Sequence, residues 1–169
     1  NLISILSEIT SYRSSETTQK PIMIKVDPDN TKAHYGMILN SVKKFNIDGI
    51  ITTNTTLSRN NNLLSKNKRE DGGLSGLPLK DTSNNVLKFL SKESNGEVAL
   101  IGVGGIETAK DVYDKIKFGA SLVQLYTSMT IHGPGLINTI KKDLVRLLAS
   151  DGLNNIKDAI GVESRWTSQ

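Results

Sequence analysis

The chain has 169 residues, 37% of them hydrophobic, and a formal net charge of +4, which is typical of one globular domain with a sizeable core. It has no cysteine, which excludes disulfides, thiolate metal sites and a cysteine nucleophile. Its basic residues are scattered among acidic ones and only 5% of residues are aromatic, so we expect no nucleic-acid partner. His34 and His132 lie far apart in the sequence, so we expect no metal site. No apolar run approaches the roughly 20 residues that span a bilayer, and we expect no signal peptide.

The first part of the chain predicts two helices and two strands. Apolar residues at helical spacing predict a helix over residues 2–9, and a polar loop follows over residues 10–20. A β-rich run between Pro21 and Pro28 predicts a short buried strand. Residues 48–54 predict the second strand. Between the strands we expect a helix over residues 31–45 whose inward stripe is Ala33, Met37, Ile38, Val42 and Phe45.

The rest of the chain continues the alternation of strands and helices. A long polar loop over residues 55–80 leads into a helix with Val86, Phe89 and Leu90 facing inward. Residues 98–103 and 121–126 predict the third and fourth strands. The helix between these strands carries Ala109, Val112, Tyr113 and Ile116 on its inward face. A long helix with a stripe of Leu136, Ile140, Leu144, Leu147 and Leu148 follows, and a short helix ends at Gly161.

Strands that alternate with helices predict a parallel sheet covered by helices. The strand runs are continuously apolar, as in strands that are buried on both faces. Two architectures fit: a small open doubly wound sheet, or half of a (β/α)8 TIM barrel, since a complete barrel needs eight units and about 250 residues. The sequence shows no domain boundary, so residues 1–169 are either one small domain or the C-terminal half of a single barrel domain. A half barrel would leave a strand edge that needs cover.

In both architectures ligands bind at the carboxyl ends of the strands. Four groups of residues follow the four predicted strands: Lys25; Asn54 between threonines; the glycine turn at residues 102–105; and Tyr126, Thr127 and Ser128. The turn does not match the dinucleotide pattern G-x-G-x-x-G, because its sixth position is Glu107. Backbone amides in such a turn suit a phosphate. Without a P-loop or a carboxylate pair for Mg²⁺, we predict a bound phosphorylated cofactor.

Six blocks of sequence, in this order and spacing, resemble the dihydroorotate dehydrogenase family. They are "IKVDPD", "NIDGIITTNTT", "GGLSGLPLK", "IGVGGI", "GASLVQLYTSM" and "LNNIKDAIG". The resemblance covers residues 21–161 and is to the class 2 enzymes, which are membrane-associated and quinone-dependent. It implies that the chain supplies strands five to eight of an FMN-binding TIM barrel. The implied reaction is oxidation of dihydroorotate to orotate with a quinone as electron acceptor, a step of pyrimidine biosynthesis.

The resemblance also implies roles for nine residues. Lys25 would stabilise negative charge on the reduced flavin, and Asn54 and Thr55 would bind dihydroorotate or orotate. The implied cofactor-binding residues are Lys25, Thr53, Gly76, Gly104, Gly105, Tyr126 and Thr127, of which the last four would hold the FMN phosphate.

The implied catalytic base is a serine that lies upstream of this sequence, as do the first four strands and the helices that bind membrane and quinone. We therefore expect the N-terminal half of the same enzyme as a partner. We expect the mitochondrial inner membrane as the location, or else a bacterial inner membrane. A class 1 soluble dihydroorotate dehydrogenase, another FMN barrel such as a dihydrouridine synthase, and a non-catalytic phosphate- or FMN-binding α/β fragment remain as alternatives.

Overall fold

The fold is a parallel α/β arrangement, as the sequence predicts. The computed structural model describes residues 2–59 and 63–164 of the chain, so residues 60–62 of the predicted polar loop lie outside the described residues. One sheet holds its strands in chain order, all parallel: β1 (Met23–Val26), β2 (Gly49–Thr52), β3 (Ala99–Val103) and β4 (Leu122–Gln124). Strands that follow one another in sequence and in space are the pattern of a (β/α) barrel.

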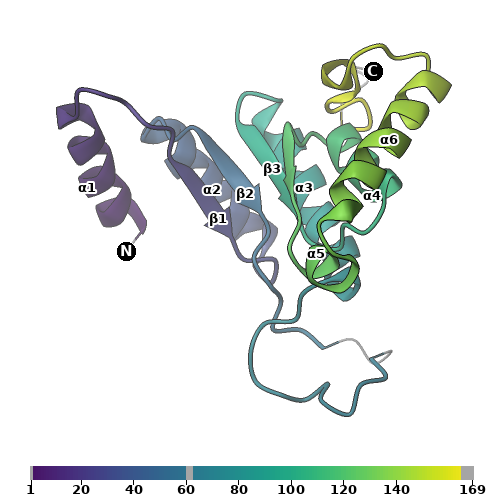
Figure 1. The fold of residues 1–169 in the computed structure, drawn as a ribbon. Coiled ribbons are helices and arrows are strands. Elements are labelled where there is room, and N and C mark those ends of the chain that lie inside the picture. Colours follow the sequence, from purple (N-terminus) through teal and green to yellow (C-terminus); the bar gives the residue numbers. More distant parts are fainter. Residues whose placement is uncertain (1, 60–62, 165–169) are drawn as a thin grey trace.

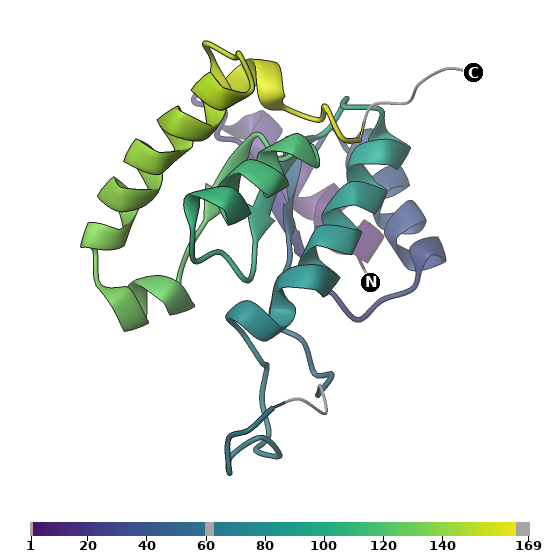
Figure 2. The same ribbon diagram turned by 90° about the vertical axis from the view of Figure 1, so that its right-hand side faces the viewer.

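Helices lie on one side of this sheet, as Figure 1 shows. The described helices are α1 (Leu2–Ser15), α2 (Lys32–Lys44), α3 (Lys80–Ser94), α4 (Ala109–Lys117), α5 (Thr127–His132) and α6 (Gly135–Ser150), with 3₁₀ turns η1 (Leu77–Leu79) and η2 (Ile156–Ala159). Helices α2, α3 and α4 follow the first three strands and cover the sheet, and α6 packs against α4 (Figure 1 and Figure 2).

The two faces of the sheet differ in burial. Residues paired across parallel strands point to the same face, and Ile50 and Leu100 are such a pair. Both are almost fully buried beneath the helices. On the other face Lys25, Ile51 and Ile101 form one row, which is exposed at Lys25 and only half-buried at the two isoleucines. The strands are therefore buried on one face in this chain, whereas the sequence predicts burial on both.

Helix α1 is longer than its apolar pattern predicts. It continues through Ser15, so residues 10–15 are helical and only the remainder of the predicted loop is irregular. The hydroxyls in this stretch donate to carbonyls of the preceding turn, and Thr10 Oγ1 donates to Leu6 O at 2.7 Å. Leu6 is the buried residue of the helix. Arg13 holds the end of the helix to the core through an ion pair of 2.7 Å with Asp48.

Helix α2 begins and ends as predicted, but the face it buries is rotated. Met37, which the sequence places on the inward stripe, is 60% exposed. Tyr35 and Leu39 are buried instead, beside Ile38 and Val42. The Tyr35 hydroxyl donates to Asp27 O at 2.8 Å, and this hydrogen bond draws the ring inward and ties the helix to the turn after β1.

A long loop leaves the sheet after β2 and returns before η1, projecting beyond the carboxyl ends of the strands together with α5 (Figure 1 and Figure 2). Its two ends are joined by hydrogen bonds between Thr56 and Leu74 in both directions, at 3.1 and 2.8 Å. Arg59 donates to several carbonyls of the loop, including those of Glu70 and Gly72. The base of the loop is therefore fixed beside the end of β2.

Candidate functional site

A pocket lies at the carboxyl ends of the four strands, and all nine residues implicated by the sequence line it. They are Lys25, Thr53, Asn54, Thr55, Gly76, Gly104, Gly105, Tyr126 and Thr127. Because each parallel strand ends at the same edge of the sheet, residues separated by a hundred positions meet there. Further residues that line the pocket include Ser75, Leu79, Gln124 and Ser128. The nine residues thus belong to one site.

Lys25 brings a positive charge to the pocket from the end of β1. Its side chain is exposed, and no acceptor for its ammonium group is found among residues 2–59 and 63–164. An ammonium group buried without a partner in an apolar strand would cost free energy. The strand instead turns Lys25 toward the face that the helices leave open, so the charge stays hydrated. It remains available to a negatively charged ligand.

The segment after β2 is held to both neighbouring strands. The Asn54 amide donates to Val26 O at 2.7 Å, and the Thr53 amide donates to Val103 O at 3.2 Å. The Thr53 side chain is buried, and its hydroxyl donates to Asn54 O at 2.8 Å. These bonds fix the backbone on which Asn54 and Thr55 stand, so the polar side chains at this end of the sheet have a rigid base.

The glycine turn after β3 contains two backbone amides with no hydrogen-bond acceptor among the described residues. Gly104 and Gly105 have φ angles of 104° and 68°, which favour glycine over residues with a side chain. A Cβ atom on Gly105 would also collide with Lys80 at the start of α3. Neither glycine amide donates to any residue that the structure describes. Two free amides in a left-handed turn are suited to bind an oxyanion.

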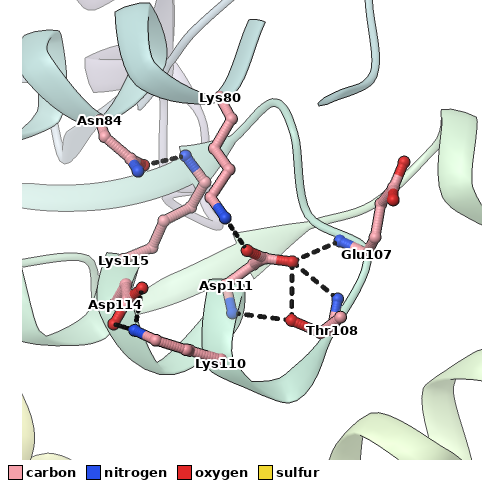
Figure 3. Close-up of polar contacts among 8 residues, drawn as sticks. All are labelled: Lys80, Asn84, Glu107, Thr108, Lys110, Asp111, Asp114 and Lys115. Atoms are coloured by element: carbon pink, nitrogen blue, oxygen red, sulfur yellow. Dashed lines mark hydrogen bonds and ion pairs between the residues drawn. The ribbon is translucent and has the colours of Figure 1, made fainter. Parts of the chain in front are cut away.

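The amides at the start of α4 cannot serve the same purpose. Asp111 Oδ2 accepts hydrogen bonds from the amides of Glu107 and Thr108 at 3.0 and 2.8 Å, and from the Thr108 hydroxyl at 2.8 Å (Figure 3). Thr108 in turn caps the helix by accepting from the Asp111 amide, which completes a capping box. The amides of Glu107 and Thr108 are thus occupied, whereas those of Gly104 and Gly105 have no acceptor among the described residues.

Asp111 is compensated by Lys80, its ion-pair partner from the first residue of α3 (Figure 3). Burial raises the pKa of Asp111, but the hydrogen bonds from Lys80, Glu107 and Thr108 outweigh burial and the net shift is downward. The same hydrogen bond raises the pKa of Lys80. Both groups are therefore charged at neutral pH, and the carboxylate beside the glycine turn is neutralised.

Hydroxyl groups form the remaining wall of the pocket, around the start of α5. The Thr127 hydroxyl donates to Ser75 Oγ at 2.9 Å, which joins α5 to the end of the long loop. Tyr126 lies at the rim and is 82% exposed. Ser128 is 4% exposed, and its hydroxyl has no hydrogen-bond partner within the described part of the chain. The sequence predicts neither α5 nor the burial of Ser128. The predicted strand over residues 121–126 ends directly before α5, and no separate helical pattern marks the start of that helix.

The fold and the pocket define the class of protein. Four parallel strands with helices on one side, and a pocket at their carboxyl ends, are the arrangement of one half of a TIM-barrel enzyme. A family model described as dihydroorotate dehydrogenase matches residues 3–148, and the chain belongs to this family.

Relatives in this family match nearly the whole of this chain. The chain is 42% identical to the dihydroorotate dehydrogenase (quinone) of Xanthobacter autotrophicus over 166 residues, which are 96% of the chain and 46% of that protein. It is 40% identical to the mitochondrial dihydroorotate dehydrogenase (quinone) of Mus musculus over 163 residues, which are 95% of the chain and 41% of that protein. The chain therefore spans about half the length of the curated relatives it matches.

Solved structures agree with this placement. The ligand-free dihydroorotate dehydrogenase of Eimeria tenella superposes with a TM-score of 0.93 at 36% identity, covering 98% of the chain and 50% of that protein. Its complex with ferulenol gives a TM-score of 0.92, covering 98% and 48%. These relatives confirm the predicted family and the predicted half barrel. Within residues 2–59 and 63–164, no helix is long and apolar enough to cross a bilayer, and no acidic or histidine cluster suits a metal.

Proposed function

We propose that this chain forms the carboxyl-terminal half of a flavin-dependent dihydroorotate dehydrogenase that oxidises dihydroorotate to orotate and passes the electrons to a quinone. The observation that carries the proposal is that all nine implicated residues line one pocket. The relatives named above are quinone-dependent dihydroorotate dehydrogenases, which supports the proposed acceptor. Orotate formation would place the enzyme in pyrimidine biosynthesis.

FMN is the proposed cofactor, and the residues present fit it. Gly104 and Gly105 offer two free amides for the phosphate, and the Thr127 hydroxyl lies in the same pocket. The buried hydroxyl of Ser128, without a partner among the described residues, adds a donor that a ligand would satisfy. Gly76, in a backbone conformation with φ of 76°, presents no side chain to the cofactor. When bound, FMN supplies the hydride acceptor.

Lys25, Asn54 and Thr55 are the proposed reaction-side residues. The exposed ammonium of Lys25 would stabilise the negative charge that the flavin would gain on accepting a hydride. Asn54 offers both a donor and an acceptor, and Thr55 offers a hydroxyl, for the amide edges of the substrate ring. Because the backbone below them is hydrogen-bonded to two strands, these groups would orient the ring without reorganising.

We propose that a second half barrel completes the site and supplies the base, a serine, that removes the substrate proton. The strands β1 and β4 are the outer strands of this sheet, so each has an edge on which a further strand can pair. The same half would bind the quinone and the membrane surface. The mouse relative is named mitochondrial, which supports the mitochondrial inner membrane as the proposed location.

The test is an assay of the complete enzyme. We expect it to be yellow, to contain FMN, and to form orotate from dihydroorotate when a soluble quinone analogue is supplied. Orotate formation with a water-soluble acceptor that is not a quinone, and none with the quinone analogue, would favour the class 1 alternative. A colourless protein that forms no orotate would leave the non-catalytic fragment as the better description.

A further inference from the structure

Lys115, on α4, is a buried lysine that the proposed reaction does not use. Its side chain is 0% exposed. The ammonium donates to Ser83 Oγ at 2.9 Å and to Asn84 Oδ1 at 2.8 Å, both from the second turn of α3 (Figure 3 draws the Asn84 contact). Burying a lysine among neutral partners costs free energy that a methionine in the same place would not. The position of Lys115 therefore calls for a functional explanation.

The lysine reaches α3 by passing beside the end of β3. A Cβ atom on Gly102 would lie 2.9 Å from Lys115 Cδ, so the stem of the lysine fills the space that a side chain on Gly102 would need. Beyond it, the Ser83 hydroxyl donates to Val103 O, the carbonyl directly before Gly104. Val103 O also accepts from the amide of Thr53. Lys115 is thus the first member of a chain of hydrogen bonds that ends at the pocket.

A second contact holds the far end of the same turn. Lys80 pairs with Asp111, which in turn binds the amides of Glu107 and Thr108 (Figure 3). Both contacts come from residues near the start of α3. Ser83 holds Val103, which precedes Gly104, and Lys80 holds Asp111, which binds the amides that follow Gly105. The free amides of Gly104 and Gly105 therefore lie between two parts of the backbone that are held by hydrogen bonds, Val103 on one side and Glu107 and Thr108 on the other.

We propose that Lys115 is a positioning residue for the phosphate turn: through Ser83 it fixes Val103, and with it the glycine amides that bind the phosphate of FMN. The inference rests on the proposed function, because it assumes that FMN is the ligand. It adds a residue that touches neither cofactor nor substrate and acts from the opposite side of β3. The affinity for the phosphate depends on how well the two amides are aimed, so the lysine contributes to phosphate recognition.

The test compares two flavins, FMN and riboflavin, which lacks the phosphate. Apoenzyme is prepared from the complete wild-type enzyme and from the Lys115→Met variant, which keeps the stem and removes the ammonium. Flavin binding is measured by the quenching of flavin fluorescence. Lys117→Met is the matched control, since it removes an ion pair with Glu163 from the same helix but no contact to Ser83. Ser83→Ala is the second variant, because it breaks the link to Val103 while leaving Asn84 to the lysine.

We expect Lys115→Met to weaken FMN binding by about tenfold, as removal of a residue that supports a ligand-binding group does. Riboflavin binding should change little, so the preference for FMN over riboflavin falls. Ser83→Ala should shift the preference in the same direction, and Lys117→Met should not.

An equal loss of affinity for FMN and for riboflavin in Lys115→Met would overturn the inference, because it would indicate general damage to the pocket. An unchanged preference in Ser83→Ala would overturn it even where Lys115→Met does not fold. If the wild-type enzyme forms orotate and all variants keep their preference, the inference fails and the proposed function stands. If the wild-type enzyme binds neither flavin, the inference and the proposed function both fail.

Discussion

Asp29 Oδ2 accepts a hydrogen bond from the Leu57 amide at 2.7 Å, and this contact joins the turn after β1 to the segment after β2. Asp29 Oδ1 accepts a second bond from the Thr56 hydroxyl. Asn54 and Thr55 lie in the same segment, directly before Thr56. The carboxylate of Asp29 is therefore one of the groups that hold the proposed substrate-binding residues in place.

Asp29→Ala should raise the KM for dihydroorotate by about tenfold, with a smaller change in kcat, because the segment that carries Asn54 and Thr55 loses two hydrogen bonds worth about 1 kcal/mol each. Steady-state kinetics of the complete enzyme measure both constants. Asp71→Ala, which removes another loop carboxylate, is the control. A lower thermal stability with an unchanged KM would contradict the proposed positioning.

Lys25→Ala should slow reduction of the flavin by dihydroorotate by roughly a hundredfold, since a charge aimed at the reacting centre is lost. Stopped-flow absorbance of the bound flavin under anaerobic conditions measures this step directly. Lys32→Ala removes an exposed lysine from the first turn of α2 and should leave the rate unchanged. A Lys25→Ala enzyme with full flavin content and full rate would show that the assignment of Lys25 is wrong.

Ser128→Ala should have opposite effects on the apoenzyme and on cofactor binding. The buried hydroxyl has no partner among the described residues, so its removal should stabilise the apoenzyme by about 1 kcal/mol. If FMN satisfies this hydroxyl, the variant should bind FMN more weakly. Thermal unfolding with and without FMN checks both effects. A variant whose FMN affinity equals that of the wild type would remove Ser128 from the cofactor site.

The buried state of Lys115 predicts a dependence of stability on pH. Burial lowers the pKa of Lys115 to about 8, while nearby Asp111 raises it and Lys80 lowers it by smaller amounts. Above this pH the folded protein has lost a proton that the unfolded chain keeps up to its ordinary pKa of 10.5. The unfolded state then binds more protons, so the free energy of unfolding rises with pH in this window.

The expected size of this effect is about 2 kcal/mol between about pH 7.5 and pH 9.5. It is measured as the difference between the wild type and Lys115→Met in urea unfolding at each pH, which cancels groups common to both. Below the pKa of Lys115 the difference should be constant. A difference that stays constant up to pH 9.5 would mean that Lys115 titrates as an ordinary lysine.

The sequence could predict the strands and the site because both follow from local rules. Short apolar runs bounded by proline or glycine define the strands, and the residues after each strand meet at one edge whatever the details of packing. Lys25, Asn54 and Gly104 could therefore be assigned to a common site before the structure was known. To place these three residues together, it is enough to know that the strands are parallel.

What the sequence could not predict depends on tertiary contacts. The helical state of residues 10–15 is not encoded by apolar spacing, since that stretch is polar, and Arg13 anchors it through Asp48. The inward turn of Tyr35 depends on a hydrogen bond to a distant carbonyl. The pairing of Asp111 with Lys80 joins α3 to the start of α4, and no local pattern reveals it.

The close approach of Gly102 and Lys115 has a consequence for the evolution of this protein. A side chain at position 102 and a long side chain at position 115 would compete for one space beneath β3. A lineage that gains a methyl group at position 102 must therefore shorten residue 115, and then needs another way to hold Ser83. We expect positions 83, 102 and 115 to change together among descendants of this sequence or not at all. A single substitution at any one of these positions should therefore be rare.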